Sequence, residues 1–265
     1  MLFCKGLNAR SRPLAAVAAL LLPACPASAA VLTNGNFEAP TGTDSSTTTF
    51  PSWGESTGAA AIRATTALSG STSALLTGTN GTVGTLSQTV DPITGTFDLS
   101  FSFAAVNPGG ATAGTSDRAL QLLLTGSNGA QINLIVIRGS SSAVGSVQIY
   151  NGSFQSIASQ VDKVNFSTSL DSPVVNTLRL TGSVGGGYTV ATNGTQSGAV
   201  SYYQGGTAPL PTDFKTVNFT TVNAATVNYV VDNVTLVPEP AGAGLLAAAA
   251  AGGLAVRRRR RRQAD

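Results

Sequence analysis

Large apolar and small polar side chains alternate along residues 95–106 of this chain. The apolar residues stand at every second position: Phe97, Leu99, Phe101 and Phe103. The polar residues stand between them: Thr96, Asp98, Ser100 and Ser102. Because successive side chains of a β-strand point to opposite faces, this spacing predicts a strand with one face on a core and one face in solvent.

Similar short segments recur along the chain, separated by glycine- and asparagine-rich turns. Nine further ranges are predicted as strands: 73–76, 85–90, 120–124, 131–138, 144–150, 174–181, 187–192, 214–220 and 227–237. Asn128-Gly129, Asn151-Gly152 and Asn193-Gly194 are typical of hairpin turns. No stretch of this region has a sustained helical period. The pattern therefore predicts an all-β fold, a two-sheet antiparallel jelly-roll sandwich with about ten to twelve strands.

The first 29 residues differ from this pattern and have the three parts of a secretory signal peptide. Basic residues come first (Lys5, Arg10 and Arg12), an apolar stretch follows at 14–22, and Ala27-Ser28-Ala29 offers small residues for cleavage after Ala29. We expect a signal helix over residues 1–29. One alternative is a buried helix of the folded domain. Another is a lipoprotein-type cut before Cys25, for which the four residues 22–25 are a loose match.

The other end of the chain has the character of a membrane-held tail. Residues 241–256 carry no charge, and six arginines follow: Arg257, Arg258, Arg259, Arg260, Arg261 and Arg262. An apolar helix needs about 20 residues to cross a bilayer, so this short transmembrane helix is expected to insert weakly. By the positive-inside rule, the arginines keep its end in the cytoplasm.

The order of Pro238, Glu239 and Pro240, a weak apolar span and an arginine-rich tail resembles the PEP-CTERM sorting signal of Gram-negative bacteria. The resemblance covers residues 237–265. It implies that exosortase, a membrane cysteine transpeptidase, recognises the tripeptide and that the arginines act as the stop-transfer cluster. It also implies export, retention at the inner membrane before processing, and then a place at the cell surface or in an exopolysaccharide-rich matrix. An ordinary tail anchor is the alternative.

The net charge of the middle region and its lack of histidine and cysteine limit the functions that it can have. Between residues 31 and 237, six basic residues stand against ten acidic ones, a net charge of −4, so the +3 of the whole chain comes from its ends. This gives no support to nucleic-acid binding. The chain has no histidine, and its two cysteines, Cys4 and Cys25, precede the predicted sandwich. A Ser-His-Asp triad is therefore impossible, and neither a disulfide frame nor a thiolate site is expected in the sandwich.

The order of residues 32–38, 51–53, 86–90, 97–104 and 229–236 resembles the jelly-roll sandwiches of galactose-binding-like and carbohydrate-binding modules. Residues 176–194 are also similar to concanavalin- or laminin-G-like sandwiches, which have a different strand order. In the galactose-binding-like fold the first and last strands run side by side. The resemblance therefore implies that Glu38 and Asp232 could hold a structural calcium ion with backbone oxygens. The alternative is a pair of solvated acids at strand ends. No other cofactor is expected.

Three aromatic residues are candidates for stacking on a sugar ring: Trp53, Tyr202 and Tyr203. Trp53 is the only tryptophan, and the tyrosines precede the glycines at 205–206. The alternative for Trp53 is a plug in the core or at a sheet edge. The alternative for the tyrosines is a strand-end pair with one ring pointing inward.

No catalytic residues are identified, and the sandwich region has only two glutamates, Glu38 and Glu55. We expect a signal peptide at 1–29, a sandwich domain at 30–236 and a sorting signal at 237–265. The expected function is that of an exported, non-catalytic surface or matrix protein that associates with extracellular polysaccharide. The alternatives are a carbohydrate-binding module with a defined sugar site and, less favoured, a polysaccharide hydrolase with two carboxylates.

Overall fold

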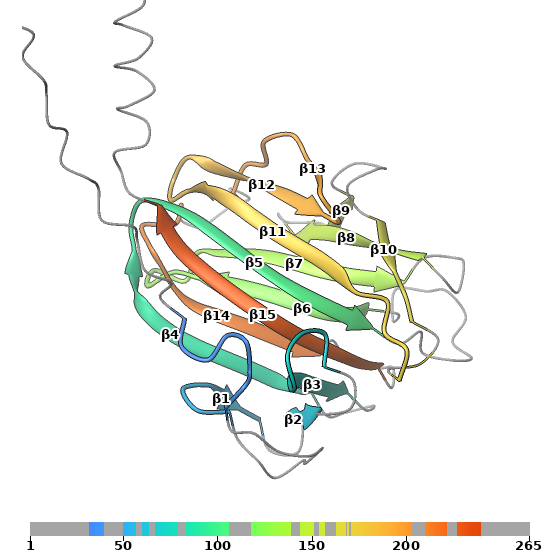
Figure 1. Ribbon diagram of the computed structural model, residues 1–265. Helices are drawn as coiled ribbons and strands as arrows, with labels where there is room; N and C mark the ends of the chain where they lie inside the picture. The colour runs from blue at the N-terminus through green and yellow to red at the C-terminus, as the bar shows by residue number, and fades with distance from the viewer. Residues whose placement is uncertain are drawn as a thin grey trace, which may run out of the picture.

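Two antiparallel β-sheets face each other as a sandwich in the computed structural model (Figure 1). The structure describes residues 32–39, 50–56, 60–63, 67–78, 83–105, 118–138, 144–150, 154–156, 163–167, 169, 171–202, 210–221 and 227–239. The predicted all-β sandwich is confirmed. The signal helix expected at 1–29 and the transmembrane helix expected at 241–256 lie outside the described residues. Within the described ranges, no helix has the length and apolar character needed to cross a bilayer.

The two sheets draw their strands from distant parts of the chain. The seven-stranded sheet has the order β13 (Thr195–Gln196), β12 (Gly187–Thr192), β11 (Asn176–Ser183), β5 (Thr96–Ala105), β15 (Val227–Glu239), β3 (Ser73–Gly78) and β2 (Ala60–Arg63). The eight-stranded sheet has the order β1 (Gly54–Glu55), β4 (Thr85–Ile93), β14 (Phe214–Thr221), β6 (Arg118–Thr125), β7 (Gln131–Arg138), β8 (Val144–Tyr150) and β10 (Lys163–Asn165), with β9 (Phe154–Ser156) paired to β8. The last strand therefore lies beside an early one, because β15 pairs with β3.

The alternation read from the sequence places β5 between core and solvent. Its four large apolar side chains are all buried: Phe97, Leu99, Phe101 and Phe103. Two of these rings meet rings of β14 in the facing sheet. The centroids of Phe97 and Phe214 lie 5.2 Å apart, and those of Phe101 and Phe219 lie 5.0 Å apart. Edge-on ring pairs of this kind join the two sheets across the core.

The predicted turn at Asn193-Gly194 is confirmed between β12 and β13. Both residues have positive φ, 50° and 82°, as a two-residue type I′ turn requires. Asn128-Gly129 lies in the loop between the paired strands β6 and β7, where Gly129 has φ of 79°. Asn151-Gly152 lies outside the described residues. The strands that the pattern did not predict are β1, β2, β9, β10 and β13, which have two to four residues each, too few to display a period.

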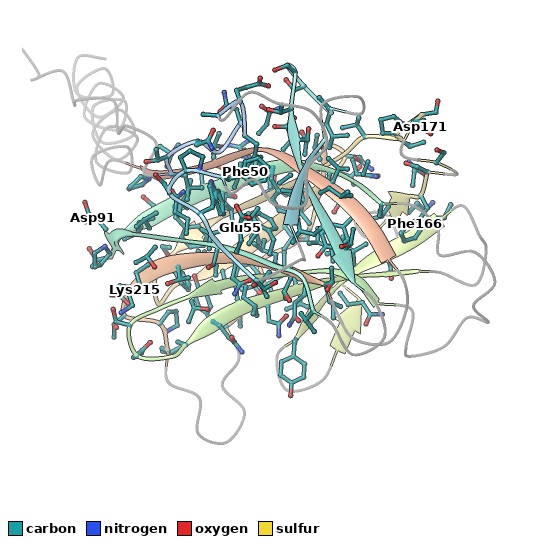
Figure 2. The ribbon with its side chains drawn as sticks, turned by 90° about the horizontal axis from the view of Figure 1, so that it is seen from below. Phe50, Glu55, Asp91, Phe166, Asp171 and Lys215 are labelled. Atoms are coloured by element: carbon teal, nitrogen blue, oxygen red, sulfur yellow. The ribbon has the colours of Figure 1, made fainter. Side chains whose placement is uncertain are left out.

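The segment before β1 packs at the edge of the sandwich. Phe37 is fully buried, with ring centroids 5.0 Å from Phe50 and 5.2 Å from Trp53. Trp53 in turn lies 6.3 Å from Phe219 of β14. Figure 2 shows Phe50 among the crowded side chains between the sheets, whereas Asp91 and Asp171 lie at opposite ends of the sandwich.

The last strand runs further than the sequence predicted. β15 pairs with β3 only from Val227 to Val231, but it pairs with β5 until Glu239, the partner of Thr96. β15 therefore runs across the boundary predicted between residues 236 and 237, where the sorting signal is expected to begin. At Pro238 one edge of β15 is not paired with β3. Proline, which has no N–H to donate, fits a strand when its nitrogen faces such an unpaired edge.

Candidate functional site: a polar groove and a carboxylate clasp

A groove of about 540 Å³ lies on the outer face of the seven-stranded sheet. Its residues come from five strands and one turn: Ser100, Phe101, Ser102, Thr177, Leu178, Arg179, Thr181, Thr189, Ala191, Gly194, Gln196, Asn233 and Thr235. Most of them occupy the polar positions of the alternating pattern. Phe101 and Leu178 point into the core and contribute to the floor. The groove is therefore the solvent side of the strands whose other side builds the core.

The strand register aligns one set of groove residues across the whole sheet. Thr235 pairs with Ser100, Ser100 with Arg179, Arg179 with Ala191, and Ala191 with Gln196. We call this line of five the polar rung. Neighbouring strands lie about 4.8 Å apart, so the rung is about 19 Å long and runs across the strands.

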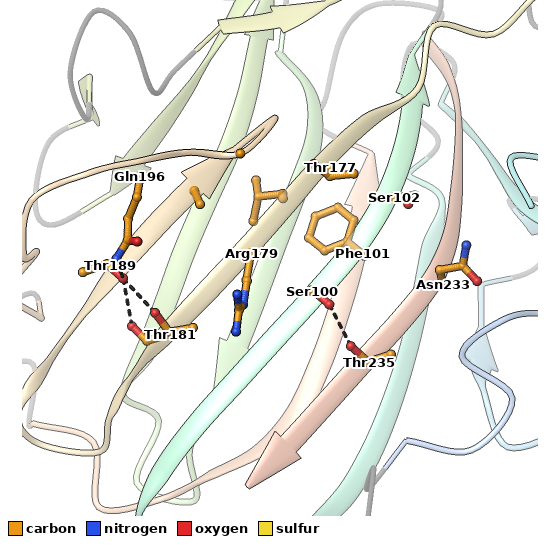
Figure 3. A pocket seen from close by; sticks show the side chains of 13 residues that line it. Ser100, Phe101, Ser102, Thr177, Arg179, Thr181, Thr189, Gln196, Asn233 and Thr235 are labelled. Carbon is orange, nitrogen blue, oxygen red and sulfur yellow. Dashed lines mark hydrogen bonds between the residues drawn. The ribbon is translucent and has the colours of Figure 1, made fainter. Parts of the chain in front are cut away.

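Side-chain hydrogen bonds hold the two ends of the groove (Figure 3). At one end the hydroxyls of Ser100 and Thr235 lie 2.8 Å apart. At the other end, the hydroxyls of Thr181 and Thr189 also lie 2.8 Å apart, and the Gln196 amide donates to Thr189 Oγ1 at 3.0 Å. Cross-strand pairs of this type fix the side chains in place before any ligand binds.

Arg179 lies between these two clusters, with its side chain 58% exposed. Its guanidinium forms a forked ion pair with Asp98 of the neighbouring strand, with Nε 2.9 Å from Oδ1 and Nη2 2.5 Å from Oδ2. The fork orients the guanidinium over the groove, and the Asp98 carboxylate balances its charge. The centre of the groove therefore offers hydrogen-bond donors without a large net charge.

Beside the groove, two carboxylates hold one loop. Glu38 accepts hydrogen bonds from the Ser71 N–H at 2.9 Å and the Ser71 hydroxyl at 2.5 Å. Asp232 of β15 accepts from the Ser69 N–H at 2.9 Å and the Ser73 hydroxyl at 2.8 Å. We call Glu38, Asp232 and the loop at residues 69–73 the carboxylate clasp. The structure thus brings Glu38 and Asp232 together on one loop.

The clasp meets the groove at a β-bulge. The register between β15 and β5 shifts between Asp232 and Thr235, and Asn233 has φ of 51°. The Asn233 N–H donates to Asp232 Oδ1 at 2.7 Å, while Asn233 itself lines the groove. The bulge turns Asp232 toward the loop and Asn233 toward the groove.

The two carboxylates have opposite pKa shifts. Hydrogen bonds from the Ser71 hydroxyl and N–H lower the pKa of Glu38. Burial raises the pKa of Asp232, which is 0% exposed, and the Glu38 charge adds to this effect, so that the pKa is about 6 despite the hydrogen bonds that lower it. Asp232 is therefore the member of the pair that takes up a proton more readily.

The clasp fits calcium in the type of its atoms, because it presents two carboxylates and the hydroxyls of Ser71, Thr72 and Ser73. Among the described residues, however, no three or more His, Cys, Asp or Glu side chains form a group that could hold a metal ion. Glu38 and Asp232 would need backbone oxygens or water to complete a calcium shell. Loop N–H groups already bond both carboxylates, so the loop is held without a cation. Calcium remains a prediction.

Two of the predicted stacking residues are core residues. Trp53 and Tyr202 are each 6% exposed. The Trp53 indole donates to the Asn34 carbonyl oxygen at 3.1 Å. The Tyr202 hydroxyl donates to the Ser183 carbonyl oxygen at 2.9 Å, and its ring packs 5.2 Å from that of Tyr188. Neither ring offers a face to solvent, so the stacking role does not fit these two residues. Tyr203 lies outside the described residues.

The sorting motif is divided by the fold. Pro238 and Glu239 belong to β15, whereas Pro240 and the six arginines at 257–262 lie outside the described residues.

The groove residues Arg179 and Gln196 were not predicted from sequence. Polar residues on one face of a strand were visible in the pattern, but only the register shows that five strands contribute to one line.

The fold and the groove define an all-β sandwich with an open polar surface site. No protein-family model matches this chain, and no curated protein matches it. Among solved structures, the chain is similar to a conserved carbohydrate esterase from the Shiga toxin-encoding bacteriophage phi24B. The TM-score is 0.50, the identity is 14%, and the match covers 71% of this chain and 90% of that one. At this identity the likeness shows the shared fold.

Two further solved structures are less similar. The carbohydrate recognition domain of Emp47p has a TM-score of 0.46 and 14% identity, with 73% of this chain and 92% of that one covered. A mutant of the alginate lyase Aly36B, solved with an alginate tetrasaccharide, has a TM-score of 0.45 and 11% identity, with 70% and 86% covered.

Proposed function

We propose that this chain is an exported, non-catalytic protein of the cell surface or extracellular matrix, which binds extracellular polysaccharide in its groove. The polar rung is the observation that carries the binding role. A line of hydroxyl, guanidinium and amide groups, about 19 Å long across five strands, suits hydrogen bonding along an extended polyhydroxylated chain.

The electrostatics of the groove favour a neutral polysaccharide. Asp98 balances the charge of Arg179, and the region from 31 to 237 carries a net charge of −4 from its six basic and ten acidic residues. A polyanion such as alginate would meet net repulsion. Hydrogen bonding to neutral sugars carries no such cost.

The chemistry of the described groove residues supports a non-catalytic role. None of the residues that line the groove is an acid, and the neighbouring Asp98 is held by Arg179. Glycoside hydrolysis generally needs two carboxylates that flank the scissile bond. The groove offers hydrogen-bonding groups in place of such a pair.

Affinity electrophoresis of the exported protein tests the binding role. We expect slower migration in gels that contain a neutral polysaccharide (dextran, xylan or galactomannan are suitable) than in gels with alginate. Arg179→Ala combined with Gln196→Ala should abolish the retardation. Lys163→Ala is the charge-matched control, because Lys163 is an exposed cation on β10 of the other sheet. Equal retardation of the double variant and the wild type, or retardation in alginate alone, would contradict the proposal.

The same groove supports the second candidate, a carbohydrate-binding module with a defined sugar site. Isothermal titration with short oligosaccharides separates the two. Saturable binding of one trisaccharide at micromolar concentration favours the defined site. Binding that strengthens only with polymer length favours the matrix role.

The sorting role rests on residues 237–265 and on their resemblance to the PEP-CTERM signal. We propose that a sorting transpeptidase of the exosortase type releases the chain from the inner membrane to the surface. The test is the intact mass of the protein in cells with and without that enzyme. A mass that still includes Arg257 to Arg262 in both strains would contradict the sorting role.

A further inference from the structure

We infer that the folded sandwich controls access to its own sorting motif, so that the end of β15 must separate from β5 before an enzyme can bind Pro238 and Glu239. The inference rests on the proposed sorting function. Its basis is the register of the last strand. Val237 pairs with Asp98, Pro238 with Phe97, and Glu239 with Thr96.

The edge of a strand that is paired with a neighbouring strand cannot at the same time bind to an enzyme. Enzymes that act on peptides commonly bind them as extended chains and use the substrate's backbone N–H and C=O groups. In β15 every second residue turns these groups toward β5, at the usual strand spacing of about 4.8 Å, which leaves no room for a second protein on that edge. Pairing with β5 therefore covers one edge of the segment that holds two of the three motif residues while the strand end is closed.

The end of β15 is also its least supported part. β3 pairs with β15 only as far as Val231, and the Gly35 carbonyl accepts the Val234 N–H at 2.7 Å. Beyond Val234, β5 is the pairing partner that the structure describes. Strand ends paired on one side open with lower free energies than the centre of a sheet.

Leu236 sets the limit of such an opening. Its side chain is 0% exposed in the core, whereas Val237 and Pro238 are partly exposed. Thr235, on the other side of Leu236, is held by its hydroxyl contact with Ser100. Separation of residues 237–239 leaves the core intact, whereas separation that includes Leu236 would expose it. The geometry points to a three-residue flap that contains the first two motif residues.

A disulfide across the flap tests this inference. Asp98→Cys with Val237→Cys joins a pair of directly opposed positions without changing the motif. Opposed positions in antiparallel strands have Cα atoms about 4.5–5.5 Å apart, which suits a disulfide. Cys4 and Cys25 both precede the sandwich, so the engineered pair would be the only cysteines within it.

The matched control is Ser100→Cys with Thr235→Cys, the opposed pair on the inner side of Leu236. This lock leaves the flap free. The single Asp98→Cys variant controls for the loss of the Arg179 partner. In cells that contain the sorting enzyme and form periplasmic disulfides, we expect the outer lock to reduce the processed fraction at least tenfold. The inner lock and the single variant should match the wild type, and a host unable to form periplasmic disulfides should restore processing of the outer lock.

Processing of the oxidised outer lock at the wild-type level would overturn the inference and leave the sorting function intact. A wild type that stays unprocessed in the presence of the enzyme would overturn both. Hydrogen exchange of the purified full chain gives a reading without the enzyme. The amides of Val237 and Glu239 should exchange at least a hundredfold faster than that of Val231, and equal protection of the three amides would also overturn the inference.

Discussion

Asp232 holds the two ends of a short loop, and Glu38 holds its middle. Glu38 accepts from Ser71 and Asp232 from Ser69 and Ser73, so two acids from the beginning and the end of the sandwich share one set of donors. The loop leads directly into β3, the neighbour of β15. The clasp therefore joins the first described segment, β3 and the last strand.

Loss of the Asp232 carboxylate should destabilise the fold. Asp232→Ala leaves the buried Ser73 hydroxyl and the Ser69 N–H without their acceptor. Unsatisfied groups of this kind cost about 1–3 kcal/mol each, so we expect a fall of about 2 kcal/mol in the free energy of unfolding at pH 7. Urea denaturation with EDTA present measures it. Asp91→Ala, at an exposed position of β4, is the control and should have little effect.

The same carboxyl should make stability depend on pH. Its pKa is raised from 3.8 to about 6 in the folded protein. Between these values the folded state holds a proton that the unfolded chain has released. The stabilisation is therefore complete at low pH and is lost as the pH rises through about 6.

Asp232→Asn removes this titration while the neighbouring acid, Glu38, stays in place. We expect the stability difference, wild type minus Asp232→Asn, to fall between about pH 4 and about pH 7. Denaturation curves at several pH values in EDTA measure the difference. A value that stays constant or rises over this range would show that the carboxyl is not titrating as described.

Calcium should raise the melting temperature if the clasp binds it, because the ion would offset the repulsion between Glu38 and Asp232. Saturating calcium at about 100 times the dissociation constant adds about 2.7 kcal/mol, which corresponds to several degrees. We expect this shift in the wild type and its loss in Glu38→Gln. Identical melting curves of the wild type in calcium and in EDTA would assign the clasp to hydrogen bonds alone.

The close approach of Gly35 to β15 gives a test of packing at the sandwich edge. A Cβ at Gly35 would overlap the Val234 carbonyl oxygen, so Gly35→Ala must displace the segment from β15. We expect a loss of at least about 2 kcal/mol in the free energy of unfolding. Gly198→Ala is the matched control, since no atom lies within 4 Å of a Cβ at that position. Equal stabilities would contradict the close approach.

The longer strands could be predicted from the sequence because their periods are long enough to read. β5 has four buried residues at every second position. The turn between β12 and β13 requires two residues with positive φ, and asparagine followed by glycine, as in Asn193-Gly194, is the pair that accepts this conformation most readily. The two-residue strands β1 and β13 carry no such signal. Their positions depend on the neighbours β4 and β12.

The site was less accessible from sequence. Asp232 and Glu38 were predicted as neighbours from a resemblance, but the donors of the loop at 69–73 were not. The polar rung depends on the register of five strands, which no local pattern contains. Trp53 and Tyr202 were misleading because a ring that is apolar enough for stacking is also apolar enough for the core. The last strand was predicted to end at Val237, two residues early, because its pairing partner β5 is far away in sequence.

From Thr96 to Phe103, β5 turns its odd-numbered residues toward the core and its even-numbered ones toward solvent, where Ser100 and Ser102 line the groove. Phe101 and Phe103 are constrained by close packing, whereas Ser100 and Ser102 face solvent and can change with little effect on folding. Under the proposed binding role, natural variation can therefore alter the ligand of the groove at Ser100 and Ser102, while selection for a stable scaffold acts on the buried residues of the same strand. Among relatives that differ in ligand preference, we accordingly expect substitutions at every second residue of β5.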